Sequence, residues 1–255
     1  MRLSPFLFYC SSRVILLQSG DIFRNLAFEA ALFTDNERFH TQDRSRTAPT
    51  DILMWRSDPC VVIGRFQNAW KECNLDFLRA NQWLLARRQS GGGSVFHDRD
   101  NLNVSFMQAR SVLNRRNCME FLQSVLQRLV PAKKIIIGDR FDLWQADAGE
   151  NGLASAKRKI SGSASRLGAK VAYHHCTLLC ETNLNNLSEV LSPTFKTLRS
   201  KSTDSVRSPV ANIGLSVEEL ERSIIDDSLE WLIKVSRLRL RSQKVNLFKP
   251  VTAFL

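Results

Sequence analysis

Apolar and polar positions follow two rhythms along this chain, one typical of helices and one typical of strands. Apolar residues recur at helical spacing in Ile22–Thr34, Arg115–Val130 and Ser216–Val235, and shorter helices are predicted at Asp76–Asn81 and Leu184–Leu191. Apolar or alternating runs predict strands at Val14–Leu17, Ile52–Trp55, Cys60–Ile63, Trp83–Ala86, Ser94–Phe96, Asn101–Phe106, Ile135–Ile137, Lys159–Ala164 and Ala172–Cys180. The sum is an α+β fold, mostly antiparallel sheet with helices packed against it.

The same spacing predicts which side chains face the core. The inner face of the first helix is expected to carry Phe23, Leu26, Ala27, Ala30, Ala31 and Phe33. Asn101–Phe106 alternates between polar and apolar side chains, so this strand is expected to be half-buried. Ser216 and Glu219 have the spacing of a capping box at the start of the last helix. Loops are predicted at His40–Asp51, Asp147–Ala156 and Lys196–Arg207.

Composition limits the classes of protein that the chain can represent. With 255 residues it can form one large domain, or a domain plus a small appendage. No apolar run approaches the roughly 20 residues of a membrane-spanning helix. The net charge of +11 indicates acidic partners, without choosing among nucleic acid, an anionic membrane and an acidic protein. Six scattered cysteines show no disulfide framework, which favours a reducing compartment.

The first residues differ from the rest in charge. No acidic residue precedes Asp21, and the opening segment mixes Arg2, Arg13 and several serines with apolar residues. Mitochondrial presequences share this composition. Residues 1–13 are therefore predicted to be a short mitochondrial presequence, although Pro5 interrupts any helix there.

A basic pair followed by three glycines, Arg87-Arg88-Gln89-Ser90-Gly91-Gly92-Gly93-Ser94, is the most unusual stretch of the sequence. Glycine loses much backbone entropy on ordering and has no side chain to pack. Such a run is useful where bare backbone N–H groups must approach an anion, and arginines suit a phosphate. A flexible hairpin turn is the alternative. Because Trp83–Ala86, predicted to be a buried strand, leads into the run and a second predicted strand leads out of it, a binding site is favoured.

Other segments rich in functional groups follow predicted strands. They are Gly64–Asn74, Gly138–Leu143, Lys159–Ala164 and His174–Leu179. A zinc site at His174, Cys176 and Cys180 is rejected, because Cys176 and Cys180 would lie about 13 Å apart along an extended strand. No metal site is expected.

Five of these motifs, in order, resemble the lipoate–protein ligase and lipoyltransferase family. They are GRFQNxWKECN, SGGGSVFHD, RFDL, KISGSA and HHCTLL, and the resemblance as a whole covers about residues 14–213. Cys176, where bacterial ligases usually carry glycine, makes the chain most like the animal mitochondrial branch. The biotin-ligase relatives carry a GRGRxGR-type loop that is missing from this sequence. The resemblance therefore implies the biotin/lipoate ligase-like catalytic fold and a lipoyl or octanoyl group rather than biotin.

The resemblance also implies roles for individual residues. Lys159 is expected to be catalytic, stabilising charge on the acyl carbonyl and the α-phosphate. The lipoyl and AMP moieties are expected to contact Arg88, Gly92, Gly93, Ser94, Val95, Phe96, Arg140, Asp142 and Thr177. Two alternatives remain open, a core role for Phe96 and an ion pair between Arg140 and Asp142. Covalent catalysis by Cys176 is not expected.

The implied reaction moves a lipoyl or octanoyl group from lipoyl-AMP or a lipoylated carrier to a lysine of an acidic lipoyl domain. The acceptors would be acyltransferase subunits of 2-oxoacid dehydrogenase complexes in the mitochondrial matrix, with the glycine cleavage H protein as a possible donor. No tightly bound cofactor is implied. An ATP-dependent ligase, using ATP with magnesium, is the alternative within the same chemistry.

The implied catalytic domain covers residues 14–235. Residues 236–255 form a divergent basic tail, and the family's usual C-terminal accessory domain is expected to be absent. The protein is expected to be a monomer that binds neither membrane nor nucleic acid, since no nucleic-acid-binding motif is present. Two readings of another class stay open: a basic nucleic-acid-binding module and an inactive truncated isoform.

Overall fold

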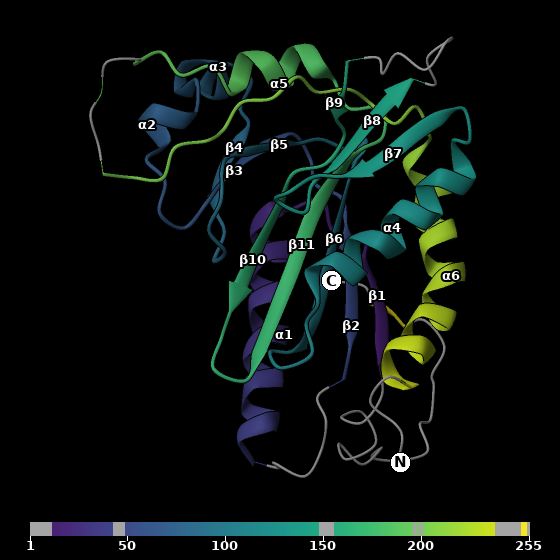
Figure 1. Cartoon of the computed structure of the whole chain (residues 1–255). Helices are drawn as coiled ribbons and strands as arrows, with labels where there is room; N and C mark the ends of the chain where they lie inside the picture. Colours follow the sequence, from purple (N-terminus) through teal and green to yellow (C-terminus); the bar gives the residue numbers. More distant parts are fainter. Residues whose placement is uncertain are drawn as a thin grey trace.

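A six-stranded sheet runs through the centre of the computed structural model (Figure 1), which describes residues 12–42, 49–147, 156–195, 198, 201–237 and 251–253. Its strands lie in the order β10 (Ser163–Leu167), β11 (Val171–Leu179), β6 (Asn101–Ala109), β2 (Asp51–Trp55), β1 (Arg13–Leu17) and β12 (Val251–Ala253). Strands β10, β11, β6 and β2 are antiparallel to their neighbours in that series, whereas β1 is parallel to both β2 and β12. The predicted α+β class with antiparallel-rich sheet is confirmed.

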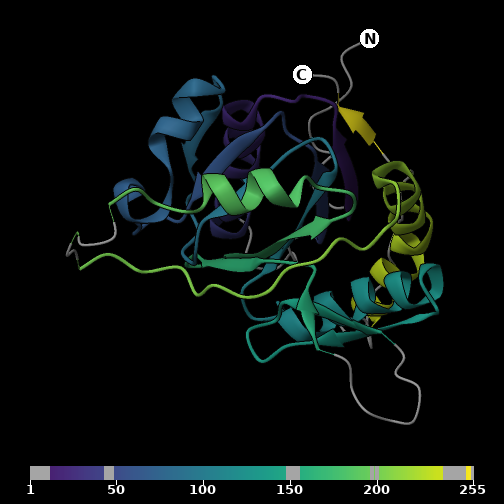
Figure 2. The ribbon, with the colours of Figure 1, turned by 90° about the horizontal axis from the view of Figure 1, so that it is seen from above.

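Helices cover both faces of this sheet, as the view from above shows (Figure 2). Helix α1 (Ile22–Gln42) packs on one face against Leu53, Trp55 and Tyr173. Helices α4 (Arg115–Leu129) and α6 (Val217–Arg237) cover the opposite face, where Ile52 and Phe106 are buried. Every residue of β6 is consequently buried, so the expectation of a half-buried strand is wrong.

The inner face of α1 differs from the predicted one. Phe23 is 52% exposed, and the buried positions are Ile22, Asn25, Glu29, Leu32, Phe33 and Asn36. Three polar side chains lie in this buried row because each has a partner there. Asn25 donates to the backbone carbonyls of Ser19 and Arg56, Asn36 donates to Asp51, and Glu29 accepts from His175. Hydrogen bonds thus compensate for burying them.

Two three-stranded sheets flank the central one. The first has the order β4 (Leu84–Arg87), β3 (Cys60–Ile63), β5 (Val95–His97), and it packs beside α2 (Ala69–Glu72), α3 (Leu75–Ala80) and α5 (Leu184–Val190). Strand β4 begins one residue after the predicted strand, and Leu84 is 44% exposed, so the expectation that this strand is buried is wrong. Since β4 and β5 pair with opposite edges of β3, the glycine run between them crosses over β3 and is not a hairpin turn.

The second small sheet has the order β7 (Lys133–Ile137), β8 (Leu143–Asp147), β9 (Arg158–Lys159). The predicted single strand Lys159–Ala164 is therefore divided between two sheets. Lys159 belongs to β9 and pairs with Trp144 of β8. Strand β10 starts at Ser163 and pairs with β11. This division places Lys159 where the small sheet meets the edge of the central one.

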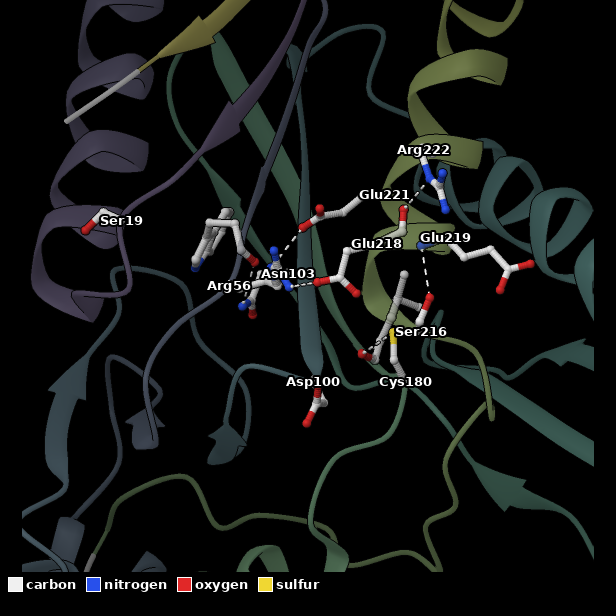
Figure 3. Close-up of polar contacts among 12 residues, drawn as sticks. Ser19, Arg56, Asp100, Asn103, Cys180, Ser216, Glu218, Glu219, Glu221 and Arg222 are labelled. Carbon is white, nitrogen blue, oxygen red and sulfur yellow. Dashed lines mark hydrogen bonds and ion pairs between the residues drawn. The ribbon is translucent and has the colours of Figure 1, made fainter.

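Helix α6 is fixed to the central sheet at its first turns (Figure 3). The Ser216 hydroxyl accepts a hydrogen bond from the Glu219 backbone at 3.3 Å, as the predicted cap requires. Arg56, which follows β2, lies 2.6 Å from Glu218 and 3.2 Å from Glu221. These ion pairs join the end of β2 to the start of α6.

Several sequence predictions fall partly or wholly outside the described residues. The predicted presequence is covered only at residues 12 and 13, and residues 148–155 and 238–250 lie outside the described ranges. The predicted loop His40–Asp51 is wrong at both ends, because residues 40–42 belong to α1 and Asp51 is a buried residue of β2. Among the described helices, none has both the length and the apolar character needed to cross a membrane.

Candidate active site

Two adjoining cavities, of about 240 Å³ and about 350 Å³, lie where the three sheets meet. The residues that line both are Ser94, Val95, Lys159, Gly162, Thr177, Ser205 and Val206. Each site residue singled out from the sequence lines at least one of the two cavities. Motifs that are far apart in the sequence therefore converge on one place in the fold.

Lys159 stands at the junction of these cavities. Its ammonium group lies 2.7 Å from the carboxylate of Asp142, and its side chain is only 16% exposed. The backbone of Lys159 is held as well, since its N–H donates to the Pro209 carbonyl at 2.8 Å and its carbonyl accepts from Ala211 at 3.0 Å. The position of this cation is thus set by both its side chain and its main chain.

Asp142 holds its charge through its partners. Burial favours the neutral acid, yet contacts with Lys159 and Trp144 outweigh burial and lower the pKa of the Asp142 carboxyl group. The indole N–H of Trp144 donates to Asp142 at 3.0 Å. Arg140, which is exposed, lines the smaller cavity, and the ion pair left open between Arg140 and Asp142 is replaced by the pair with Lys159.

The turn before Asp142 contains Phe141 in the left-handed region, with φ of 61°. A bulky residue rarely adopts this conformation, and the surroundings must compensate for it. The Arg115 guanidinium lies 4.5 Å from the centre of the Phe141 ring, and the His174 ring meets that ring edge-on at 6.3 Å. These contacts hold the turn that presents Asp142 to Lys159.

The glycine loop packs closely on the end of β3. A Cβ atom on Gly64 would lie only 2.2 Å from the carbonyl oxygen of Gly92, so no side chain fits at Gly64. Gly92 has φ of 83°, a conformation that glycine adopts without steric cost. Gly92 and Gly93 then form part of the wall of the smaller cavity with bare backbone.

Arg88 holds this loop from beneath. Its side chain is buried, and its terminal NH2 group donates to the carbonyls of Gly91 and Gly93, both at 2.6 Å. A further donor reaches Val62 at 3.1 Å, and Nε donates to Ser90 at 2.9 Å. Burial lowers the pKa of Arg88 to about 10, which leaves it charged at neutral pH. Although Arg88 lines the cavity, most of its donors are used by the protein itself.

A second network ties the loop to the segment after α5. The Ser94 hydroxyl donates to Gln67 at 2.9 Å, and the Ser94 backbone donates to Ser205 at 2.8 Å. Gln67 also accepts from the Gly64 backbone at 2.9 Å and donates to Ser205 at 3.0 Å. The Ser205 hydroxyl in turn donates to the Glu72 carboxylate. Residues from three segments thereby form one wall of the site.

The remaining predicted residues contribute apolar or backbone-holding contacts. Phe96 lines the larger cavity and also lies 5.3 Å from the Trp83 ring, so it is a core residue and a wall residue together. Val95 borders both cavities. The Thr177 hydroxyl accepts from the Gly162 backbone at 3.0 Å, which fixes the small residues after Lys159.

Sequence reasoning missed the groups behind the glycine loop. His175 lines the smaller cavity, and its ring contacts the Glu29 carboxylate at 3.0 Å and the Ser90 hydroxyl at 2.8 Å. The signal was present in the sequence, because Glu29 shares a helical face with Ile22 and Phe33. A carboxylate in an apolar row indicates a buried partner.

The neighbouring cysteine and histidine are not arranged for nucleophilic or metal chemistry. Burial raises the pKa of Cys176 to about 12, so its thiol stays protonated. His174 contacts the Ser165 hydroxyl at 2.8 Å, and burial lowers the pKa of its imidazole to about 3. Within the described ranges, no group of three or more His, Cys, Asp or Glu side chains converges as a metal site would require.

Comparison with known proteins agrees with this geometry. The family model for the lipoyl protein ligase A/B catalytic domain matches residues 21–228. Lipoyl amidotransferase LIPT1, mitochondrial, of Mus musculus and of Homo sapiens is 37% identical over 201 residues, which cover 78% of this chain and 49% of each relative. The chain thus spans about half the length of these curated relatives.

Solved structures share the fold. Plasmodium falciparum LipL1 in complex with lipoate has a TM-score of 0.69 at 21% identity, covering 95% of this chain and 66% of that one. Lipoate-protein ligase A bound with ATP has a TM-score of 0.66 at 24% identity, covering 95% of this chain and 89% of that one. With the matched domain and the converging motifs, the chain belongs to the lipoyl protein ligase A/B catalytic-domain family.

Proposed function

We propose that this chain is a lipoyltransferase, an acyltransferase that forms an amide bond on a carrier protein. It would move a lipoyl or octanoyl group from an activated donor to one lysine of a lipoyl domain. The observation that carries the proposal is the placement of the Lys159 ammonium, paired with Asp142, at the junction of two cavities walled by the glycine loop.

The shape and polarity of the cavities support this substrate class. The larger cavity is bordered by Phe96, Leu179, Leu187 and Leu191, which suit an aliphatic chain. The smaller one has Arg140 and Lys159 along its wall with the backbone of Gly92 and Gly93, which suits an anionic group such as a phosphate. A molecule with a fatty chain joined to a phosphate would have its reactive carbonyl near Lys159.

Amide formation from lipoyl-AMP requires charge stabilisation. The neutral amine of the acceptor lysine attacks the acyl carbonyl carbon, the new C–N bond forms, and the bond from that carbon to the phosphate oxygen breaks. AMP leaves with the electron pair, and the amine releases its proton to solvent. The Lys159 ammonium would stabilise the negative charge that develops on the carbonyl oxygen and the leaving phosphate.

The donor is lipoyl-AMP or a lipoylated carrier, and the glycine cleavage H protein is one such carrier. An ATP-dependent ligase is the alternative, supported by the 35% identity over 206 residues to lipoate-protein ligase A of Psychrobacter cryohalolentis. Incubation of the protein and an apo lipoyl domain with lipoate and ATP–magnesium, with lipoyl-AMP, or with a lipoylated carrier separates the two. Transfer only in the presence of free lipoate and ATP would contradict the transferase assignment.

The acceptors would be acidic lipoyl domains of 2-oxoacid dehydrogenase acyltransferase subunits. The net charge of +11 supports such partners, because opposite charge speeds the encounter. The mammalian relatives are named as mitochondrial, which supports a location in the mitochondrial matrix. We propose no resident cofactor, since the nucleotide in this reaction is part of a substrate.

Replacing the catalytic cation gives the first test. Lys159→Ala should lower the rate of lipoyl transfer from lipoyl-AMP by about 10²–10³-fold, the usual cost of losing one stabilising donor. Mass spectrometry of the apo lipoyl domain over time measures this rate. Lys157→Ala is the matched control, because Lys157 is exposed two residues away and lines neither cavity.

The control variant should transfer at the wild-type rate. An unchanged rate in Lys159→Ala would remove Lys159 from the mechanism. Absence of transfer in wild-type protein with every donor would instead favour a catalytically inactive chain.

A further inference from the structure

A buried row of hydrogen bonds runs behind the glycine loop. Arg88 donates through Nε to the Ser90 hydroxyl at 2.9 Å, and that hydroxyl lies 2.8 Å from Nε2 of His175. Nδ1 of the same imidazole lies 3.0 Å from the Glu29 carboxylate. All four residues are less than 9% exposed, so these contacts are largely shielded from water.

The direction of each hydrogen bond follows from the chemistry of the groups. The Arg88 nitrogen can only donate, so the Ser90 oxygen accepts. Burial favours a neutral Glu29, but contacts with His175 and hydrogen bonds from Ser105 and Tyr173 outweigh it and lower the pKa of this carboxyl group. The ionised Glu29 accepts a hydrogen from Nδ1 of His175, and Nε2 of the same ring shares a hydrogen bond with the Ser90 hydroxyl. The row thus runs from a guanidinium to a carboxylate.

We infer that Glu29 is a positioning residue for the acyl-transfer site, which orients the glycine loop through His175, Ser90 and Arg88. The inference rests on the proposed function for its catalytic readout. Arg88 is the last member of the row, and it holds the carbonyls of Gly91 and Gly93. With those carbonyls fixed, the intervening backbone keeps its orientation toward the cavity.

The order of Ser90, His175 and Glu29 matches that of a hydrolytic triad, but the surroundings exclude nucleophilic attack by Ser90. The Ser90 side chain is 1% exposed and lines neither cavity. Its oxygen already accepts from Arg88. A serine so placed transmits orientation and does not meet a substrate.

Glu29 itself does not line the smaller cavity, whereas His175 and Arg88 do. Its effect must therefore be indirect and should concern the donor bound against the glycine loop. The acceptor lysine arrives on another protein and does not depend on Glu29 for recognition. This predicts a split between the kinetic constants for the two substrates.

The test compares Glu29→Leu with Glu29→Gln in transfer from lipoyl-AMP to an apo lipoyl domain. The leucine removes the acceptor, and kcat/KM for the donor should fall by about 10–100-fold, the cost of a misplaced site. The KM for the lipoyl domain should not change. The glutamine keeps an oxygen that accepts from His175, and it should restore the donor kcat/KM to within about threefold of wild type.

Glu37→Leu is the matched control on the same helix. Glu37 accepts from the backbone of Lys170 and Val171, away from both cavities. This variant should lose stability without a change in the donor kcat/KM. An equal donor defect in Glu37→Leu and Glu29→Leu would show a general structural role and overturn the inference, as would a wild-type kcat/KM in Glu29→Leu.

A second measurement does not depend on catalysis. Amide hydrogen exchange in residues 88–94 should accelerate by about tenfold in Glu29→Leu, because the loop loses its support. Exchange in α4 should stay as in wild type. If Glu29→Leu fails to fold, Ser90→Ala breaks the row at its centre and should give the same two effects. Unchanged loop exchange in both variants overturns the inference. If the wild-type protein does not transfer a lipoyl group but loop exchange still accelerates in the variants, only the proposed function is rejected.

Discussion

Two arginines, Arg88 and Arg56, hold parts of this molecule in place by different physical means. The Arg56 side chain is 27% exposed and pairs directly with Glu218 and Glu221 at the start of α6 (Figure 3). Arg88 is 6% exposed, and within the part of the chain that the structure describes its hydrogen bonds go to backbone carbonyls and to Ser90. Its charge is balanced at a distance by Glu29.

The difference concerns how a charge is used. A half-exposed ion pair joins two elements, but water and salt compete with it. A buried guanidinium that donates to several backbone carbonyls fixes the conformation of the segment that carries them. Its removal leaves those carbonyls without a donor. The first arrangement serves attachment of a helix, and the second serves the geometry of a site.

The largest effect should come from Arg88→Met, which keeps the length of the side chain and removes its donors. The free energy of unfolding should fall by about 3–5 kcal/mol, because several buried carbonyls lose their shared donor. Transfer should be lost together with stability. Urea denaturation measures the first effect, and a loss below about 1 kcal/mol would mean that Arg88 is no more important than a surface arginine.

Arg56→Gln should have a smaller effect of about 1–2 kcal/mol, because the Glu218 side chain is 59% exposed and only that of Glu221, 9% exposed, loses a buried partner. The destabilisation should shrink further in high salt, and the lipoyl-transfer rate should stay at its wild-type value. The same denaturation series at low and high salt measures it. A loss of transfer in Arg56→Gln would contradict the separation of the two clusters.

The smallest expected effect is the change in the free energy of unfolding as the pH is lowered. The pKa of Glu29 is lowered in the folded protein, so its ionised form contributes stability that is present above pH 4.5 and is lost as the pH falls through the lower folded value. The difference in free energy of unfolding between wild type and Glu29→Gln should therefore narrow below about pH 4.5. A difference that grows in acid would reverse the assigned sign. Denaturation of both proteins from pH 6 to about pH 3 provides the measurement.

Sequence patterns located most of the site and missed what supports it. The glycine loop could be found because three consecutive glycines after two arginines are unusual, whereas Lys159 and Thr177 were singled out by the resemblance to the family. The buried polar residues that hold the site in place could not be found from apolar periodicity alone. Asn25, Glu29 and Asn36 occupy inner positions of α1 that an apolar stripe would leave out. Their partners explain them: the Ser19 and Arg56 carbonyls for Asn25, and side chains of β11 and β2 for the other two.

Strand boundaries failed for a related reason. Lys159 and Ser163 belong to one continuous run of small and polar residues, yet they pair in different sheets. Pairing is decided by neighbours distant in sequence, which local patterns do not contain. Similarly, α1 and α4 cover β6 from opposite sides, so both of its faces are buried. The alternation of polar and apolar residues in this strand therefore did not indicate an exposed face.

The segment from Ser205 to Pro209 links the two walls of the site. Ser205 accepts from the glycine loop at Ser94, and Pro209 accepts from the backbone of Lys159. Four residue steps span at most about 14 Å. The segment therefore acts as a spacer of fixed length, and adding or deleting one residue within it would change the distance between the loop and the lysine.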